Sequence, residues 1–350
     1  MIAIAIAAFA LALVIALAWR NAWAPAVGAL AGVAVALVGG VVEVRDLGDG
    51  LGELWRPMIS IVGIMVTTVC AAEEGVFRRM ATMIEPRTRG PVRHAFRFVF
   101  AIAALTAALL SNDAAILLVT PVVVELLRTV YPKRNPKFLV PFAFAAFVSA
   151  GVAPFPTGNP MNLVVAYRAG IGFNEYALHM VPVALVSSLA SVAVATHGRA
   201  RLARIVAGVS WELLPFLFGV LVLATALARG GVTASLAALY ARAGDLQLPA
   251  IGGVATLGSA LIDNHPMALL NSHALAHAPH AHVFAALIGG DLGPRLLPIG
   301  SLAGLLWTGA LRRQGVAIPL GTFVRVGVIV TLPSVVASLA MLQFVTWLLA

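Results

Sequence analysis

The chain has 350 residues, of which 61% are hydrophobic and only 11% are charged, and its formal net charge at pH 7 is +9. Soluble domains carry about 25% charged residues, so this composition excludes a water-facing globular protein. The basic surplus is typical of membrane proteins that keep Lys and Arg in cytoplasmic loops, and it does not indicate nucleic-acid binding.

Apolar runs of 17 or more residues recur along the chain, and each is long enough to cross about 30 Å of hydrocarbon as a helix. The first run lacks both a basic stretch before it and a small-residue cleavage site after it, so it is interpreted as a retained helix. For the first half of the chain, 1–205, the predicted elements are helices 2–18, 24–42 and 57–73, a hairpin 95–127, a broken helix 138–167 and a helix 177–196.

The hairpin 95–127 is predicted to enter and leave the membrane on the same side. Basic residues flank it at both ends, and a single crossing would place one of these clusters outside the cytoplasm. Its middle consists of three polar residues, Ser111, Asn112 and Asp113, in an otherwise apolar stretch. These residues are expected at the tip of a re-entrant loop.

The span 138–167 is interrupted by prolines and a glycine between positions 154 and 160. Both residue types break helices, because proline removes a backbone donor and glycine relaxes the backbone. At membrane depth such a break persists only where it is buried in protein or lines a cavity. The segment is therefore predicted to face a polar interior.

The second half of the chain, 206–350, repeats the features of the first. Four residues recur at a constant offset of 156: Trp55, Gly63, Gly75 and Val76 correspond to Trp211, Gly219, Gly231 and Val232. The predicted elements are a helix 212–228, a hairpin 248–282, a broken helix 283–311 and a helix 322–348. The charged loops place the start of 57–73 outside and the start of 212–228 in the cytoplasm. The predicted fold is an all-α polytopic membrane protein with two inverted repeats, each containing a re-entrant hairpin and a broken transmembrane helix.

Inverted repeats with paired broken helices indicate a transporter whose site lies near the bilayer midplane. Intramembrane carboxylates cost at least about 2.5–3.5 kcal/mol, so acids at the breaks are functional candidates. A carboxyl group away from water favours its neutral form, which suits proton loading, although each Asp could also cap a half-helix. The substrate-binding candidates are Asn112, Thr157, Asn159, Asn162, Asn264 and Ser301. The proton-coupling candidates are Asp113, Asp263, His265 and Asp291.

Other residues give weaker signals. Arg295 could pair with Asp291, four residues earlier, or approach an anionic substrate. The histidine-rich loop 273–282 could bind a metal ion or be a solvated loop. A lone thiol, Cys70, cannot form an internal disulfide or a cysteine-cluster metal site. No metal, cofactor or phosphate-binding loop is expected, so ATP is not the direct energy source and ion-gradient coupling remains.

The same breaks carry a family resemblance. Residues 287–304, L-I-G-G-D-L-G-P-R-L-L-P-I-G-S-L-A-G, resemble the G-x-D-L-G-P-[KR]-x-x-P-I-G-S-L pattern of bacterial arsenite and antimonite efflux permeases, the ArsB family of the ion transporter superfamily. The stretch 111–121 resembles the family's N-D-G-A…T-P, and 159–162 resembles its S-N-x-[VM]-N element. The resemblance covers most of 50–345.

The resemblance implies proton-coupled export of trivalent arsenic or antimony as the neutral hydroxide across the bacterial inner membrane. Asp113 and Asp291 match acids of the family and are the preferred proton sites. The chain departs from the family in two ways. It is shorter by about two helices before Trp211, which leaves a homodimer open, and its second tip reads Asp263-Asn264-His265-Pro266 where the family has Asn-Asn. Nothing in the sequence indicates a soluble ATPase partner.

Three other functions could use a similar architecture. Relatives in the superfamily exchange Na⁺ for H⁺ or carry organic anions, but carriers of di- and tricarboxylates generally have S-N-T at both tips, unlike this chain. An intramembrane aspartyl protease would need G-x-G-D, and position 288 is Ile rather than Gly, so the chain is not expected to be an enzyme. A non-transporting scaffold would not explain the polar breaks.

Overall fold

The computed structural model is helical throughout the parts of the chain that it describes. The predicted helix 57–73, together with Cys70 and Ser111, falls outside those parts. The structure describes residues 1–19, 21, 23–49, 51–52, 74–109, 112–131, 135–149, 151–195, 213–313 and 315–349.

Several of the described helices have the length and apolar character of membrane spans. Two further helices, α10 (Leu213–Arg229) and α11 (Val232–Arg242), meet at a bend of 66° and would add a span if they act as one. Shorter apolar helices of 10–17 residues are also present. The segments long and apolar enough to cross a membrane alone are Val92–Leu109, Gly244–Ile262 and Leu320–Leu349.

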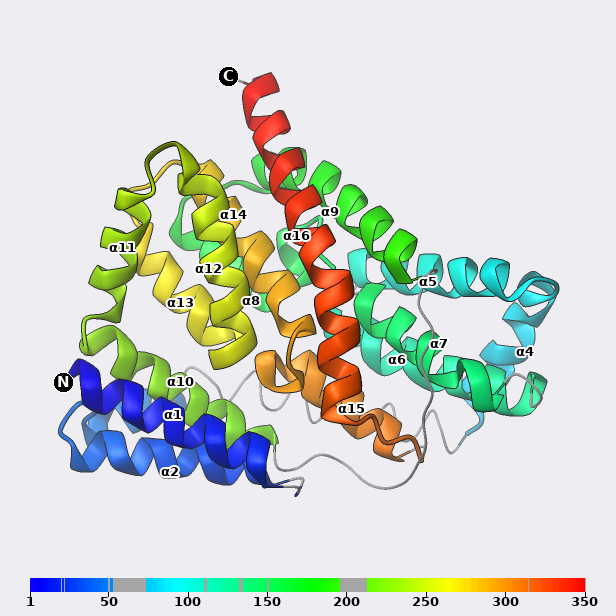
Figure 1. The fold of residues 1–350 in the computed structure, drawn as a ribbon, viewed down its shortest axis with the longest axis horizontal. Coiled ribbons are helices and arrows are strands. Elements are labelled where there is room, and N and C mark those ends of the chain that lie inside the picture. Colours follow the sequence, from blue (N-terminus) through cyan, green and yellow to red (C-terminus); the bar gives the residue numbers. More distant parts are fainter. Residues whose placement is uncertain are drawn as a thin grey trace.

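The helices form packed groups, which Figure 1 shows from one side. At one end of the molecule lie α1 (Ile2–Ala18), α2 (Ala24–Val38) and α10 (Leu213–Arg229). At the other end lie α4 (Val76–Thr88), α5 (Val92–Leu109), α6 (Asn112–Glu125), a π-helical turn (Leu126–Val130) and α7 (Asn135–Ser149).

Between these two ends lies the group that contains most of the breaks. Here α12 packs along α14, and the long α16 packs along α9. The bounds of these elements are α8 (Pro160–Arg168), α9 (Phe173–Ala195), α11 (Val232–Arg242), α12 (Gln247–Ile262), α13 (Asn264–Ala274), α14 (His280–Leu292), α15 (Leu302–Arg313) and α16 (Leu320–Leu349).

The breaks lie where prolines, glycines and polar residues interrupt the apolar runs. Between α7 and α8, the described residues 151–159 contain one 3₁₀ turn (Pro156–Gly158), which Phe155 and Asn159 flank with extended backbone. Between α14 and α15 it makes two 3₁₀ turns, Gly293–Arg295 and Pro298–Gly300. The break between α12 and α13 is a single residue, Asp263, with φ 75° and ψ 151°.

Two helices were not predicted from the sequence, α4 and α11. Each begins directly after a glycine in the left-handed region, Gly75 with φ 67° and Gly231 with φ 92°. After these glycines the described elements follow in the same order: α4 to α9 in the first half and α11 to α16 in the second. The opposite orientation of the halves stays a prediction.

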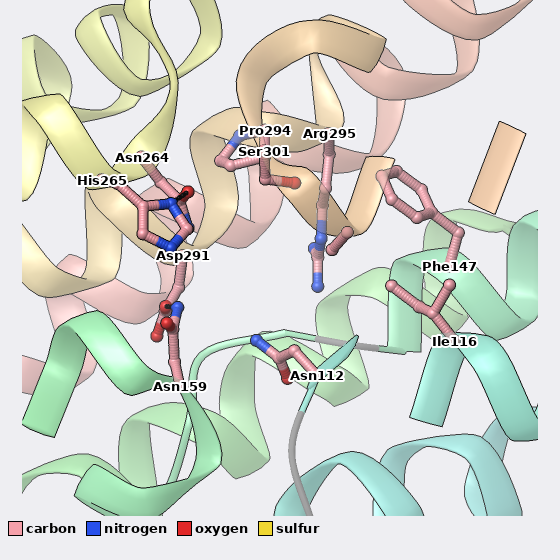
Figure 2. Close-up of a pocket in the computed structure, with 11 residues that line it drawn as sticks. Asn112, Ile116, Phe147, Asn159, Asn264, His265, Asp291, Pro294, Arg295 and Ser301 are labelled. Atoms are coloured by element: carbon pink, nitrogen blue, oxygen red, sulfur yellow. Dashed lines mark hydrogen bonds between the residues drawn. The ribbon is translucent and has the colours of Figure 1, made fainter. Parts of the chain in front are cut away.

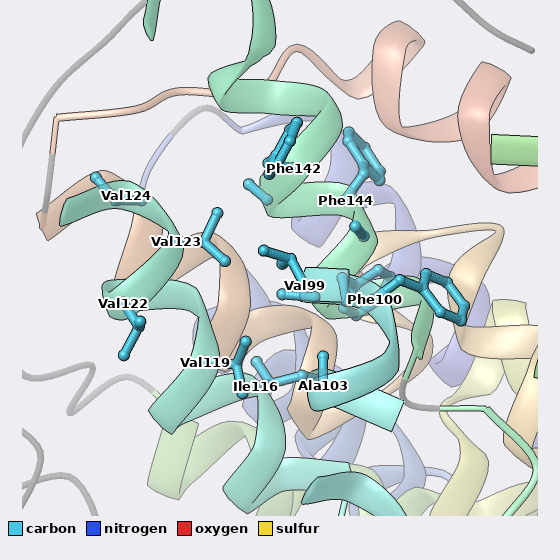
Figure 3. Close-up of a cluster of buried hydrophobic side chains, with 14 of the residues drawn as sticks. Val99, Phe100, Ala103, Ile116, Val119, Val122, Val123, Val124, Phe142 and Phe144 are labelled. Atoms are coloured by element: carbon cyan, nitrogen blue, oxygen red, sulfur yellow. The ribbon is translucent and has the colours of Figure 1, made fainter. Parts of the chain in front are cut away.

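Aromatic packing joins α7 in the first half of the chain to α15 in the second (Figure 3 shows part of this buried cluster, with Phe144 labelled). Trp307 on α15 is fully buried, stacks on Phe147 at a centroid distance of 4.8 Å and meets Phe144 edge-on at 4.8 Å. Its indole N–H donates to the carbonyl oxygen of Ala143 at 3.2 Å. Helix α7 precedes one break and α15 follows the other, and these contacts hold the two helices together.

A partly buried ion pair joins α10 to the segment after α2. Arg229 donates two hydrogen bonds to the carboxylate of Asp46, at 2.6 and 2.7 Å, and Asp46 is 8% exposed. The planar guanidinium suits this two-pronged contact. It fixes the end of α10 just before the bend at Gly230–Gly231.

Two glycines on α14 and the turn after it allow close approach of α12. A Cβ atom at Gly289 would collide with the carbonyl oxygen of Gly252, and one at Gly293 would collide with that of Thr256. Membrane helices commonly use small residues in this way, because close backbones gain dispersion contacts. Since these two glycines flank Asp291, they also set the depth at which its carboxylate lies.

Alanine at Gly289 or Gly293 is therefore expected to lower the free energy of unfolding by about 1–3 kcal/mol through overpacking. Gly253 on α12 is a matched control, because a Cβ there meets nothing within 4 Å. Alanine at that position should be neutral or stabilise by up to about 1 kcal/mol. Thermal unfolding of the purified variants in detergent measures the difference, and equal melting temperatures would refute the packing argument.

Candidate functional site

A small polar cavity of about 30 Å³ lies where the breaks meet. Figure 2 shows side chains from several segments of the chain gathered around it. Six of the ten predicted site residues line this central cavity, together with Arg295 and apolar neighbours. Those six are Asn112, Asn159, Asn264, His265, Asp291 and Ser301.

Asp291 is the most densely hydrogen-bonded of these residues. It is 5% exposed, and its two carboxylate oxygens accept three N–H donors from the facing break. The backbone N–H of Ala153 donates at 2.9 Å, and the side-chain amides of Asn159 and Asn162 donate at 2.8 and 2.9 Å. N–H donors stabilise the ionised form of a carboxyl group. This arrangement ties the break of one half of the chain to the break of the other.

Arg295 supplies the positive charge at the cavity and is 2% exposed. Its guanidinium donates to the carbonyl oxygen of Val148 at 2.5 Å and to the hydroxyl of Ser191 at 3.0 Å. It also attracts Asp291 electrostatically. The sequence left open whether Arg295 pairs with Asp291 or faces an anion. The structure directs its described hydrogen bonds to α7 and α9, and keeps its charge beside Asp291.

The tip of the second hairpin is built around Asp263. One carboxylate oxygen, Oδ1, accepts the backbone N–H of His265 at 2.9 Å and lies 2.9 Å from His265 Nδ1. Asp263 therefore caps α13, the role that was the alternative to proton binding. Its other oxygen, Oδ2, is buried and has no hydrogen-bond partner within the described structure.

Asp263 and its neighbours face different cavities. Asn264 and His265 line the central cavity, and Asn264 Oδ1 lies 2.8 Å from His265 Nδ1. Asp263 instead lines a separate, mainly apolar pocket of about 20 Å³ between this tip and helices α1, α2 and α10. The hairpin tip thus places a histidine between an acid on one side and the polar cavity on the other.

The remaining predicted residues have varied positions. Asn112 begins α6 and donates its amide N–H to the carbonyl oxygen of Gly151 at 3.3 Å. Ser301 precedes α15 and accepts the backbone N–H of Gly304 at 3.1 Å. Thr157 is exposed and is not among the residues that line the described cavities. Asp113 lies in the first turn of α6, and its side chain is outside what the structure describes.

Sequence reasoning missed three residues that support the site. Tyr176 on α9 is fully buried, accepts the amide N–H of Asn162 at 2.9 Å and donates to the carbonyl oxygen of Ala153 at 3.4 Å. Tyr240 on α11 donates to Oδ1 of Asn271 at 2.7 Å. Asn271 lines a second cavity, and its seven-residue spacing from Asn264 on one helix was a signal that could have identified it.

The histidine-rich loop divides between two environments. His280 Nδ1 lies 2.5 Å from a carboxylate oxygen of Glu175, and His273 lines a surface cavity. Within the described ranges there is no group of three or more His, Cys, Asp or Glu side chains that could hold a metal ion.

The sequence of this chain is similar to those of several known membrane proteins. The sequence profile described as "CitMHS: Citrate transporter" matches residues 1–300. An arsenical pump membrane protein of Escherichia coli is 25% identical, covering 91% of this chain and 92% of that protein. The corresponding protein of Yersinia enterocolitica is 26% identical, with 88% and 91% covered. An uncharacterized transporter of Mycobacterium tuberculosis is 25% identical, with 91% and 92% covered.

The first of these alignments spans 400 positions, more than the 350 residues of this chain. The relative therefore contains segments that have no counterpart here, in keeping with the expectation that this chain is shorter than its relatives.

Proposed function

Since this chain belongs to the CitMHS citrate transporter family, we propose that it exports arsenite and antimonite as neutral hydroxides in exchange for protons. The family consists of multi-pass membrane transporters and not of enzymes. The bacterial inner membrane is the proposed location, by analogy with the arsenical pump relatives.

The observation that carries this proposal is the charge balance of the central cavity. Its described lining contains one guanidinium, Arg295, and one carboxylate, Asp291, which offset each other. The other polar groups are amides, a hydroxyl and an imidazole, which hydrogen-bond a neutral solute without requiring charge. Citrate carries three carboxylates, and burying them would need additional cations to offset the loss of hydration.

The size of the central cavity also favours a small solute over a tricarboxylate. A cavity of about 30 Å³ has room for only about two water molecules, because one needs roughly 10–15 Å³. A hydroxide of arsenic or antimony has four heavy atoms and needs only a modest widening of such a cavity. A tricarboxylate would require a much larger opening.

The proton-coupling groups follow from the same geometry. The Asp291 carboxylate accepts three N–H donors, so a proton that binds there must displace at least one of them. Asp263 and His265 form a second acid–base pair at the hairpin tip, with one carboxylate oxygen still without a donor in the described structure. We assign them the loading and release of the proton, with Asp113 as a further candidate from the sequence.

The two-repeat architecture enters the proposal as well. The matching order of elements after Gly75 and Gly231 supports a division into halves near 205. With opposite orientations, the halves would bring the starts of α8 and α13 and the breaks around Asp291 to one depth, as the central cavity requires.

The direct test is transport by everted membrane vesicles from an arsenite-sensitive bacterial host that produces the full chain. We expect proton-driven uptake of arsenite and antimonite, loss of that uptake when the pH gradient is dissipated, and increased resistance of the cells. Vesicles without the protein are the control. Unchanged arsenite resistance together with citrate uptake would instead support an organic-anion carrier, and increased Na⁺ or Li⁺ tolerance would support a Na⁺/H⁺ antiporter.

A further inference from the structure

Three cavities lie one after another along the contact between α8 and α13. The central cavity and a second cavity of about 10 Å³ share Asn159 and Asn264. The second cavity and an outer cavity of about 230 Å³ share Val165. The outer cavity, called the vestibule below, is the largest of the three. The second cavity between them is the narrow middle, and the central cavity is the small inner chamber.

The direction of this line follows the two helices. The central cavity lies at their N-terminal ends, where Asn159 caps α8 and Asn264 begins α13. The outer cavity lies at their C-terminal ends and is lined by Arg168, Ser272 and His273. At 1.5 Å per residue, the nine residues of α8 span about 13 Å, close to half of the 30 Å hydrocarbon thickness.

The facing sides of the two helices carry asparagines among apolar residues such as Val165 and Ala268. On α13, Asn264, Ala268 and Asn271 follow each other at spacings of four and three, so they lie on one face. On α8, Asn162 and Val165 continue the line from Asn159. Four asparagines therefore line the second cavity, and burying that many amides is costly unless they hydrogen-bond.

Two tyrosines hydrogen-bond to the side-chain amides of Asn162 and Asn271, which line the second cavity. Tyr176 accepts an N–H of Asn162, whose amide also donates to Asp291. Tyr240 donates its hydroxyl to Oδ1 of Asn271, at 2.7 Å, and both residues are buried. Because this bond uses the carbonyl oxygen of Asn271, the amide keeps its N–H donors for a solute in the cavity.

We propose that the contact between α8 and α13 is the passage between the central site and the outer vestibule, with Asn162 and Asn271 forming a second binding station for a small neutral hydroxylated solute. At the outer end, Arg168 donates to the hydroxyl of Ser272 at 3.4 Å, which links the two helices across the mouth. The narrow middle, bordered by Val165, Ala268 and Leu287, is closed in this structure. The proposal rests on transport as the function, but not on the identity of the solute.

Site-directed thiol labelling tests the passage without any substrate. In full-length protein carrying Cys70→Ser, single cysteines are introduced by Ala268→Cys and by Asn271→Cys. Leu270→Cys is the matched control, because Leu270 is 1% exposed on the same helix but packs into an apolar core. The probe is a small, charged, membrane-impermeant methanethiosulfonate, applied separately to right-side-out and everted vesicles.

We expect cysteines at 268 and 271 to react at least about 10-fold faster than the cysteine at 270, from the side on which the vestibule opens. Ala268→Cys is a minimal change, so it keeps the test decisive if Asn271→Cys folds poorly. Rates at 268 equal to the rate at 270, from both sides, would overturn the passage. Fast labelling without arsenite transport would retain the passage and reject the solute.

Discussion

Replacing Asp291 with asparagine is expected to reduce arsenite transport at least about 100-fold, equivalent to roughly 2.8 kcal/mol. The carboxylate accepts N–H donors from Ala153, Asn159 and Asn162. An asparagine side chain offers one acceptor oxygen, and its own NH₂ group would face one of these donors. Each hydrogen bond to a charged group contributes about 1.5–3 kcal/mol, so the loss of one or two suffices. Uptake into everted vesicles, normalised to the amount of protein in the membrane, measures the effect.

The same substitution leaves the charge of buried Arg295 without its neighbouring anion. A buried charge without a nearby opposite charge is costly, so the loss of Asp291 should destabilise the protein. We therefore expect the double variant Asp291→Asn/Arg295→Gln to melt at a higher temperature than the sum of the single effects implies. Asp245→Asn is the matched control, because Asp245 is an exposed acid in a surface turn. Strictly additive effects would show that the two charges do not interact.

Substitutions at Asp263 are expected to separate a structural role from a coupling role. Asparagine can keep the cap, because its side-chain oxygen can accept the N–H of His265 as Oδ1 does now. It cannot carry a proton. We therefore expect Asp263→Asn to fold with nearly unchanged stability and to lose uptake driven by a pH gradient.

Alanine at position 263 should behave differently from asparagine. The backbone there, with φ 75° and ψ 151°, lies in a region that costs a non-glycine residue about 1–3 kcal/mol. Alanine keeps this strain and loses a cap worth about 1 kcal/mol, whereas glycine loses the cap but relieves the strain. The expected order of melting temperature is Asn, then Gly, then Ala. Proton-driven uptake that persists in Asp263→Asn would remove Asp263 from the coupling mechanism.

The sequence was most informative where it departs from the apolar pattern of a membrane helix. Prolines and glycines near 154–160 and 289–300 marked the two long breaks, because few other arrangements accommodate them at membrane depth. Polar residues at 112 and 263–265 marked the hairpin tips in the same way. Several residues at or next to these positions, among them Asn112, Asn159 and Asn264, line the central cavity.

Other features depend on pairing between distant parts of the chain, which local patterns do not encode. The bond between Ala153 and Asp291 joins residues 138 positions apart, and nothing local identifies the partner. Tyr176 and Tyr240 read as ordinary aromatic residues of apolar helices until their hydroxyl partners are known. Helices α4 and α11 escaped a search for long apolar runs because they are short, and α4 in addition carries several arginines.

The aromatic contact of Trp307 with Phe144 and Phe147 also limits how the molecule can change shape. Since ring contacts and the Trp307–Ala143 hydrogen bond join α15 to α7, a movement of one helix relative to the other would have to break them. At the boundary with α1, α2 and α10, Leu270 packs into the apolar core of those helices, and a small apolar pocket lies beside Asp263. A rigid-body displacement that keeps the α7–α15 contact intact would therefore have to occur at another boundary of the molecule.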